Sequence, residues 1–140
     1  MRKEIEKLLQ SVQKPARYAG GELNSVMKDK SKVALRYAFC FPDTYEIGMS
    51  HLGMKILYGV ANAREDTWCE RVFAPADDME ALMRANGEPL FALESGDPIK
   101  DFDMIGFTMQ YELSYTNILN MLDLAGVPLR AGDRESLTPI

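Results

Sequence analysis

Hydrophobic residues recur along the chain at two spacings, one typical of helices and one typical of buried strands. Apolar residues at helical spacing predict a short amphipathic helix over residues 2–12, which Pro15 ends. A loop that contains glycines follows, and strongly apolar segments begin after it. We therefore divide the chain into an N-terminal helix and Gly-containing loop, residues 1–31, and a larger α/β unit, residues 32–140.

The larger unit alternates predicted strands with predicted helices. Residues 33–41 are apolar and aromatic with a charge at Arg36, which is typical of a strand buried on both faces. Further strands are expected at 68–74, 89–93, 103–109 and 127–129, and helices at 49–63, 77–86 and 111–125. This alternation implies parallel βαβ units. The predicted fold class is α/β: a Rossmann-like (flavodoxin-like) doubly wound parallel sheet of about five strands with flanking helices.

Two of these strands, 33–41 and 103–109, are expected at the centre of the sheet. Parallel strands are covered on both faces, so their side chains should be largely buried. The side chains expected to be buried are Val33, Leu35, Tyr37, Phe39, Ile105 and Phe107. In the predicted helix 49–63, one face is lined by Leu52, Ile56 and Val60.

Composition narrows the classes of function. The net charge of −5 argues against a nucleic-acid-binding domain, because such domains usually carry a basic face. No apolar run is long enough to span a membrane, and the start of the chain carries charges where a signal peptide would need an apolar stretch. The two cysteines favour a reduced compartment, so we expect a cytoplasmic protein.

Two loops of unusual composition follow predicted strands. Residues 41–53 follow the first strand, and residues 108–115 follow the fourth. In an open parallel sheet, ligands bind outside the carboxyl ends of the strands, near the point where strand order reverses. The sequence therefore predicts that a ligand site, where there is one, lies at this edge of the sheet.

Four runs carry a family resemblance: KPARY at 14–18, GGELN at 20–24, FPDTYEIGMSHLG at 41–53 and QYELSYTN at 110–117. They resemble a bacterial family of cobalamin-binding-domain radical S-adenosylmethionine (radical SAM) proteins of unassigned reaction. The resemblance covers nearly the whole chain from Lys14 onward. It implies an N-terminal cobalamin-binding-like module whose partner is a C-terminal radical SAM domain beyond residue 140. The 4Fe-4S cluster and S-adenosylmethionine would belong to that domain, since its three-cysteine motif is absent here.

The resemblance also implies where a corrinoid would lie. Cobalamin proteins with a lower histidine ligand carry Asp-x-His-x-x-Gly after the first strand, and here Asp43 and Gly48 keep their places while Tyr45 replaces the histidine. A phenol is a poor donor to cobalt, so cobalamin would bind without a histidine ligand. The cofactor-binding residues that we expect are Asp43, Thr44, Tyr45, Glu46, Gly48, Thr108, Met109, Gln110 and Glu112.

The remaining chemically active residues favour structural roles. His51 is expected to cap or pack the first turn of a helix. Cys40 and Cys69 are expected to behave as small buried hydrophobic residues. Asp77 and Asp78 are expected to start a helix, where the helix dipole favours acids. We therefore expect no catalytic residue and no metal ligand in this chain.

Two alternatives to a corrinoid-positioning module stay open. The first is a non-catalytic docking or substrate-recognition module that kept the fold but does not bind a corrinoid. The second is a flavodoxin-like binder of a nucleotide or flavin, although the first loop has no phosphate-binding fingerprint. In addition, an unpaired sheet edge would allow the chain to self-associate.

Overall fold

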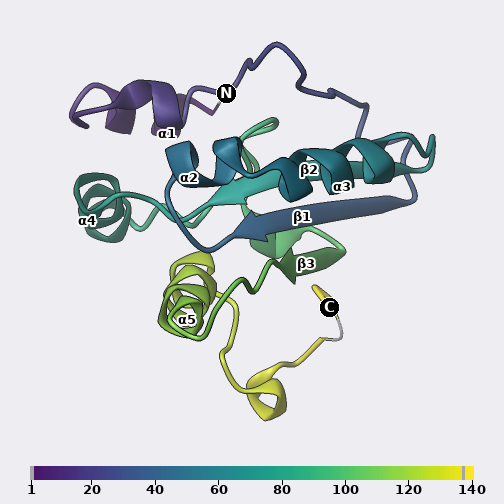
Figure 1. The fold of residues 1–140 in the computed structure, drawn as a ribbon. Coiled ribbons are helices and arrows are strands. Elements are labelled where there is room, and N and C mark those ends of the chain that lie inside the picture. The colour runs from purple at the N-terminus through teal and green to yellow at the C-terminus, as the bar shows by residue number, and fades with distance from the viewer. Residues whose placement is uncertain (1, 137) are drawn as a thin grey trace.

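The computed structural model describes residues 2–136 and 138–140 and has a parallel sheet at its centre (Figure 1). Three strands run in the same direction in the order β2-β1-β3: β1 (Leu35–Phe41), β2 (Thr67–Phe73) and β3 (Met104–Phe107). In the register, Tyr37 of β1 lies opposite Cys69 of β2 and Met104 of β3. This order confirms the α/β class and the parallel βαβ connection.

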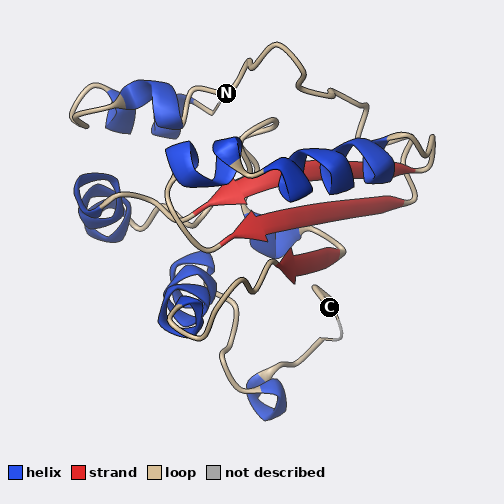
Figure 2. Ribbon diagram, in the orientation of Figure 1, coloured by secondary structure: helices blue, strands red, loops and turns tan. Residues whose placement is uncertain are grey.

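Helices cover both faces of the sheet (Figure 2). The connection from β1 to β2 contains α2 (Tyr45–Ser50) and α3 (Leu52–Asn62). The remaining helices are α1 (Lys3–Leu9), α4 (Asp77–Asn86) and α5 (Ser114–Ala125), with short 3-10 turns at Pro15–Arg17, Ile99–Asp101 and Ala131–Asp133. None of the described helices is both long enough and apolar enough to cross a membrane.

Alternate side chains of β1 enter two separate hydrophobic cores. Ala38 and Cys40 pack with α1, α4 and α5 on one face of the sheet. Phe39 and Phe41 pack with α2 and α3 on the other. This division follows from the two-residue period of a strand, and it makes β1 the strand that both cores share.

The helix ends carry the residues that the sequence indicates. The Nδ1 atom of His51 accepts a hydrogen bond from the Met54 amide at 3.2 Å, so His51 caps α3, as predicted. Asp77 and Asp78 open α4. Gly87 and Gly126 end α4 and α5 in the left-handed conformation, with φ of 66° and 72°.

Two of the five predicted strands are absent from the described sheet, and that part of the prediction is wrong. Residues 89–93 form a buried loop that folds back on itself, with one antiparallel bridge between Phe91 and Pro98 and a turn at Gly96 (φ 74°). Residues 127–129 turn away from the sheet at Pro128, which has no amide hydrogen for a ladder. Residues 89–93 are apolar because they cover the core, whereas in 127–129 only Val127 is buried and Leu129 is exposed. Composition alone does not separate either case from a strand.

The burial expected of the central strands is only partly met. Phe39 is buried, whereas Val33, Leu35, Tyr37, Ile105 and Phe107 are partly exposed. β3 lies at the edge of the described sheet, so it is covered less completely than a central strand. At its outer side, the Ile140 amide donates to the Asp103 carbonyl at 3.1 Å and the Ile105 amide donates to the Ile140 carbonyl at 2.9 Å, which is a parallel pattern.

Element boundaries also differ from the prediction at two helices. The predicted helix 49–63 begins earlier, at Tyr45, and is broken at His51 into α2 and α3. The extended backbone of His51 produces the break, because this residue ends one helix and caps the next. The predicted helix 111–125 begins at Ser114 instead, which leaves residues 109–113 as a loop.

Gly48 is required by the packing of α2 on the sheet. A Cβ atom at this position would lie 2.3 Å from a ring carbon of Phe73, which is too close for any side chain. Gly48→Ala should therefore lower the free energy of unfolding by about 1–3 kcal/mol, measured by chemical denaturation. Phe73→Leu added to Gly48→Ala should restore part of that loss, and no restoration would contradict the steric explanation.

Candidate functional site

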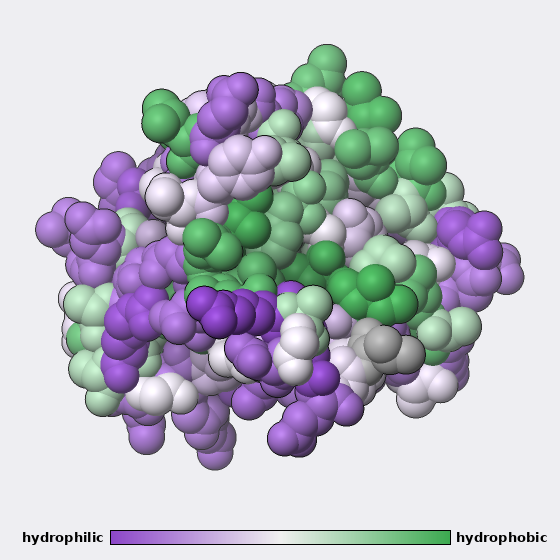
Figure 3. All heavy atoms as spheres, turned by 90° about the horizontal axis from the view of Figure 1, so that it is seen from below, coloured by the Kyte–Doolittle hydropathy of each residue, from purple (hydrophilic) through white to green (hydrophobic). Residues whose placement is uncertain are grey.

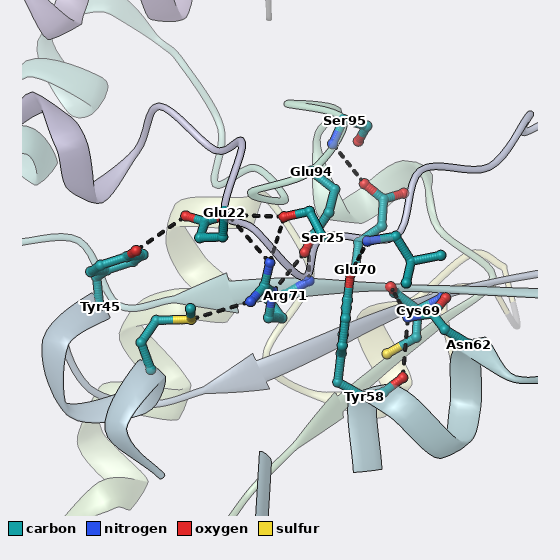
Figure 4. A network of polar contacts seen from close by, with 12 residues as sticks. Glu22, Ser25, Tyr45, Tyr58, Asn62, Cys69, Glu70, Arg71, Glu94 and Ser95 are labelled. Carbon is teal, nitrogen blue, oxygen red and sulfur yellow. Dashed lines mark hydrogen bonds and ion pairs between the residues drawn. The ribbon is translucent and has the colours of Figure 1, made fainter. Parts of the chain in front are cut away.

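A buried cation, Arg71 on β2, holds together three parts of the chain that are far apart in sequence (Figure 4). Its Nε donates to Glu94 at 2.6 Å, and its Nη2 donates to Glu22 at 3.2 Å and to Ser25 at 2.9 Å. The Glu94 side chain is fully buried and also accepts the Arg71 amide at 2.7 Å. We call residues 14–28, which cross β2 at this point, the N-terminal strap.

The electrostatics of this cluster are those of a closed ion-pair network. Burial raises the pKa of the Glu94 carboxyl, and Arg71 opposes that rise by favouring the carboxylate. Burial alone would lower the pKa of Arg71, but Glu94, together with Tyr58 and Glu22, outweighs it, so the pKa is raised. The guanidinium carbon also lies 4.6 Å from the centre of the Tyr58 ring, which adds a cation–π contact. Arg71 is thus a fixed cation with compensating partners.

A second buried pair lies beside the first. Arg36 of β1 pairs with Glu70 of β2 at 2.5 Å and with Asp97 at 3.0 Å. The Arg36 guanidinium stacks on the ring of Phe102, with 4.0 Å between the guanidinium carbon and the ring centre. Glu70 in turn accepts the Ser95 amide at 2.9 Å, so this pair also fastens the 91–98 loop to the sheet.

The first turn of α2, directly after β1, binds the N-terminal strap. The Tyr45 hydroxyl donates to Glu22 at 3.2 Å, and the Tyr45 ring lies edge-on against Phe73 of β2. Glu46 accepts a hydrogen bond from Arg17 at 2.9 Å. These contacts bring Tyr45 and Glu46 to the β2 side of β1, away from β3. Two runs that are separate in the sequence, 14–24 and 41–53, are therefore one structural unit.

The protonation states in this unit fit a structural role. Burial and the neighbouring Glu22 raise the pKa of Tyr45, so its phenol stays protonated and is a poor metal ligand. Burial raises the pKa of Cys69 to about 12 and raises that of Cys40 as well. Neither thiol is therefore a nucleophile near neutral pH. Both cysteines behave as the small buried residues that the sequence predicts.

A polar hollow of about 500 Å³ opens at the carboxyl edge of the sheet. Its lining includes Asp43 and Thr44 after β1, Asp78 and Glu80 of α4, and Asn117 of α5. The Asn117 amide donates to the Pro42 carbonyl at 2.9 Å, which ties α5 to the end of β1. No group of three or more His, Cys, Asp or Glu residues arranged to hold a metal ion occurs within residues 2–136 and 138–140.

The loop after β3 is the least engaged part of this edge. The Thr108 side-chain oxygen is buried and has no hydrogen-bond partner among the described residues. Beyond it, Met109, Gln110 and Glu112 are exposed. Residues 109–119 also carry several large apolar side chains that face solvent, namely Met109, Tyr111, Leu113, Tyr115 and Leu119.

Comparison with known families identifies the region. A family profile described as the N-terminal part of radical SAM proteins matches residues 53–140, well over half of the chain. The chain belongs to this family. No match was found among curated proteins or among solved structures. Membership in the radical SAM N-terminal family agrees with the family indicated by the sequence motifs, and it says nothing of a corrinoid.

The predicted cofactor-binding residues of this radical SAM N-terminal region fall into two groups. Asp43 and Thr44 line the hollow at the carboxyl edge, and 108–112 lie at the end of β3. Tyr45, Glu46 and Gly48 instead meet the N-terminal strap and the Phe73 ring. The first group is placed where a ligand of an open parallel sheet would bind, and the second group is occupied by contacts within the chain.

The sequence did not indicate Arg71 as the centre of the network. The signal that could have found it is the pair of charges, Glu70 and Arg71, in the middle of a strand that is otherwise apolar. A charged side chain in a buried strand requires a partner. The partners themselves, Glu22 and Glu94, are too distant in sequence for any local pattern to identify.

The network makes a clear prediction for stability. Arg71→Met leaves the Glu94 carboxylate buried without its cation, so the free energy of unfolding should fall by about 3–5 kcal/mol in a denaturant titration. Arg71→Met combined with Glu94→Leu removes both charges and should be less destabilised than Arg71→Met alone. Equal stability of the single and double variants would contradict a direct Arg71–Glu94 pairing.

Proposed function

We propose that this domain is a non-catalytic module that docks against the radical SAM domain of the same protein through residues 109–119. The observation that carries the proposal is the exposure of five large apolar side chains in this short segment, of which Leu113 is 79% exposed. Exposed apolar clusters of this kind are typical of interaction surfaces. The domain's family, the N-terminal part of radical SAM proteins, supplies the partner.

The position of the segment supports the proposal. It follows β3 and continues into α5, so it lies at the carboxyl edge of the sheet. Ligands of open α/β sheets bind at this edge, and binding sites often lie between two domains. The face that carries α5 and the β3 edge shows a band of hydrophobic residues bordered by polar ones (Figure 3). A domain that covers 109–119 would also close over the hollow lined by Asp43 and Thr44.

A docking role is consistent with the chemistry of the described residues. The charged groups with the deepest burial, Glu70, Arg71 and Glu94, are consumed in ion pairs that hold the fold. The thiols are protonated and buried. The groups left available at the carboxyl edge are hydroxyls, amides and carboxylates, which bind and orient a ligand but need a second domain to supply redox chemistry.

The docking surface can be tested in the full-length protein by hydrogen exchange. Peptides that cover residues 109–119 should exchange slowly, because the radical SAM domain covers them. Leu113→Asp should abolish that protection and speed proteolysis between the two domains. Leu23→Asp, at a leucine that is 99% exposed on the strap, is the matched control and should change neither readout. Exchange of 109–119 as fast as that of an exposed loop would refute the docking surface.

A second candidate function is the positioning of a corrinoid at the same edge, with no histidine below the cobalt. The observation in its favour is the buried Thr108 hydroxyl without a described partner, next to a free loop at the point where strand order reverses. Asp43, Thr44 and the 108–112 loop are the residues that would meet the corrinoid. Tyr45 contributes to that site by fixing the loop after β1 and does not ligate the metal.

Anaerobic reconstitution of the full-length protein with hydroxocobalamin, followed by desalting and absorbance spectroscopy, tests this candidate. Retention of cobalamin should survive Tyr45→Phe and weaken by about tenfold in Thr108→Val, if the hydroxyl makes one hydrogen bond to the corrinoid. Electron paramagnetic resonance of the cob(II)alamin form should be the same in His51→Ala. Loss of a nitrogen splitting in that variant would show histidine ligation and overturn the assignment.

A further inference from the structure

Helix α3 exposes an apolar stripe on the side opposite to its buried face. Met54 and Tyr58 face the sheet and are buried. Leu52, Ile56 and Val60 recur four residues apart and are 69%, 55% and 64% exposed. A helix that covers a sheet ordinarily presents polar residues to solvent on this side. The stripe is therefore not explained by the packing of the described chain.

Two small residues extend the same stripe toward the end of the helix. Gly59 and Ala63 follow Leu52 at seven and eleven residues, so they lie on the face of Leu52 and Ile56. A glycine inside a helix costs about 1 kcal/mol relative to alanine. A Cβ atom at Gly59 would meet no described atom within 4 Å, so packing within the described chain does not require the glycine. Its absence of a side chain leaves room for something that approaches the helix backbone.

Along the line of Leu52, Ile56, Gly59 and Ala63, two large residues precede two small ones, which makes this line complementary to itself. In an antiparallel pair of α3 helices with a two-fold axis between residues 57 and 58, Leu52 of one copy lies opposite Ala63 of the other. Ile56 then lies opposite Gly59. Large side chains thus meet small ones at both ends of the pair, as close helix packing requires. Lys55, opposite Val60, extends its aliphatic stem along the contact and keeps its charge in water.

A groove beside the stripe enlarges the surface. It has a volume of about 370 Å³ and lies between α3 and the N-terminal strap, lined in part by Val26, Met54 and Gly59. A stable interface buries roughly 800 Å² on each partner, more than one short helix face supplies. Side chains of a second copy that reach past Gly59 would enter this groove.

We propose that α3 forms the interface of a two-fold symmetric homodimer, in which Leu52 and Ile56 of each copy pack against Gly59 and Ala63 of the other. The self-complementary order of large and small residues selects a second copy of this chain over an unrelated partner. This interface lies on the face of the sheet that carries α2 and α3, whereas the proposed docking segment, 109–119, leads into α5 on the other face. The two surfaces are therefore independent.

Sedimentation equilibrium of the full-length protein tests the proposal. The wild type should be a dimer at micromolar concentration. Ile56→Gln should raise the dissociation constant by about 30-fold or more, as expected of a residue at the centre of an interface. Gly59→Leu should raise it to a similar extent because the new side chain fills the space that receives Ile56. The latter change increases helix propensity, so the monomer should stay folded.

The matched control is Leu129→Gln, at an exposed leucine outside both proposed surfaces, which should leave the dissociation constant unchanged. A wild-type protein that is monomeric at micromolar concentration would overturn the proposal. A dimer that survives both Ile56→Gln and Gly59→Leu would overturn it as well. Failure of the docking surface at 109–119 in the exchange experiment would have no bearing on these outcomes, since none of them depends on that segment.

Discussion

The fold depends on one buried cation. Arg71 points from the edge strand β2 into a place where water does not reach, and a charge there is tolerable only with partners in fixed geometry. Glu94 and Glu22 supply those partners from segments that lie 23 and 49 residues away in sequence. Because of this requirement, the N-terminal strap and the 91–98 loop both close over β2, and an edge strand becomes fully buried. Such covering also removes an open sheet edge, which is otherwise prone to unwanted pairing.

Local patterns predicted the parts of the fold that local physics determines. The strands β1 and β2, the capping role of His51 and the left-handed glycines at the ends of α4 and α5 follow from residues within a few positions of each other. The two strands that did not form show the limit of this reasoning. Residues 89–93 are as apolar as a strand, but their amide groups bond to α5, to β2 and within their own loop, so they never form a ladder. The choice between ladder and loop was made by tertiary contacts.

The candidate site shows the same limit in a different form. Tyr45, Glu46 and Gly48 stand in a motif that suggests a cofactor loop, and the structure accounts for all three by contacts with Glu22, Arg17 and Phe73. A run of residues that is specific to a family can therefore record a packing requirement as easily as a ligand. At the same edge, contacts within the described chain do not explain the buried Thr108 hydroxyl or the exposed loop after it. A ligand at this edge would therefore find its unused polar group at the end of β3, where the Thr108 hydroxyl has no partner among the described residues.

The ion-pair network also bears on the outer surfaces. The strap that Arg71 holds through Glu22 is one wall of the groove beside α3, so the shape of the groove is set by a buried contact on its floor. A wall fixed in this way costs little entropy to present to a partner, since it is already ordered before binding. Among the described residues, the loop at 109–113 has no comparable anchor between Thr108 and the start of α5, and its apolar side chains must be ordered when they are covered. Of the two proposed surfaces, the α3 face is therefore the one that is already ordered before binding. The loop after β3 loses conformational entropy when a partner covers it.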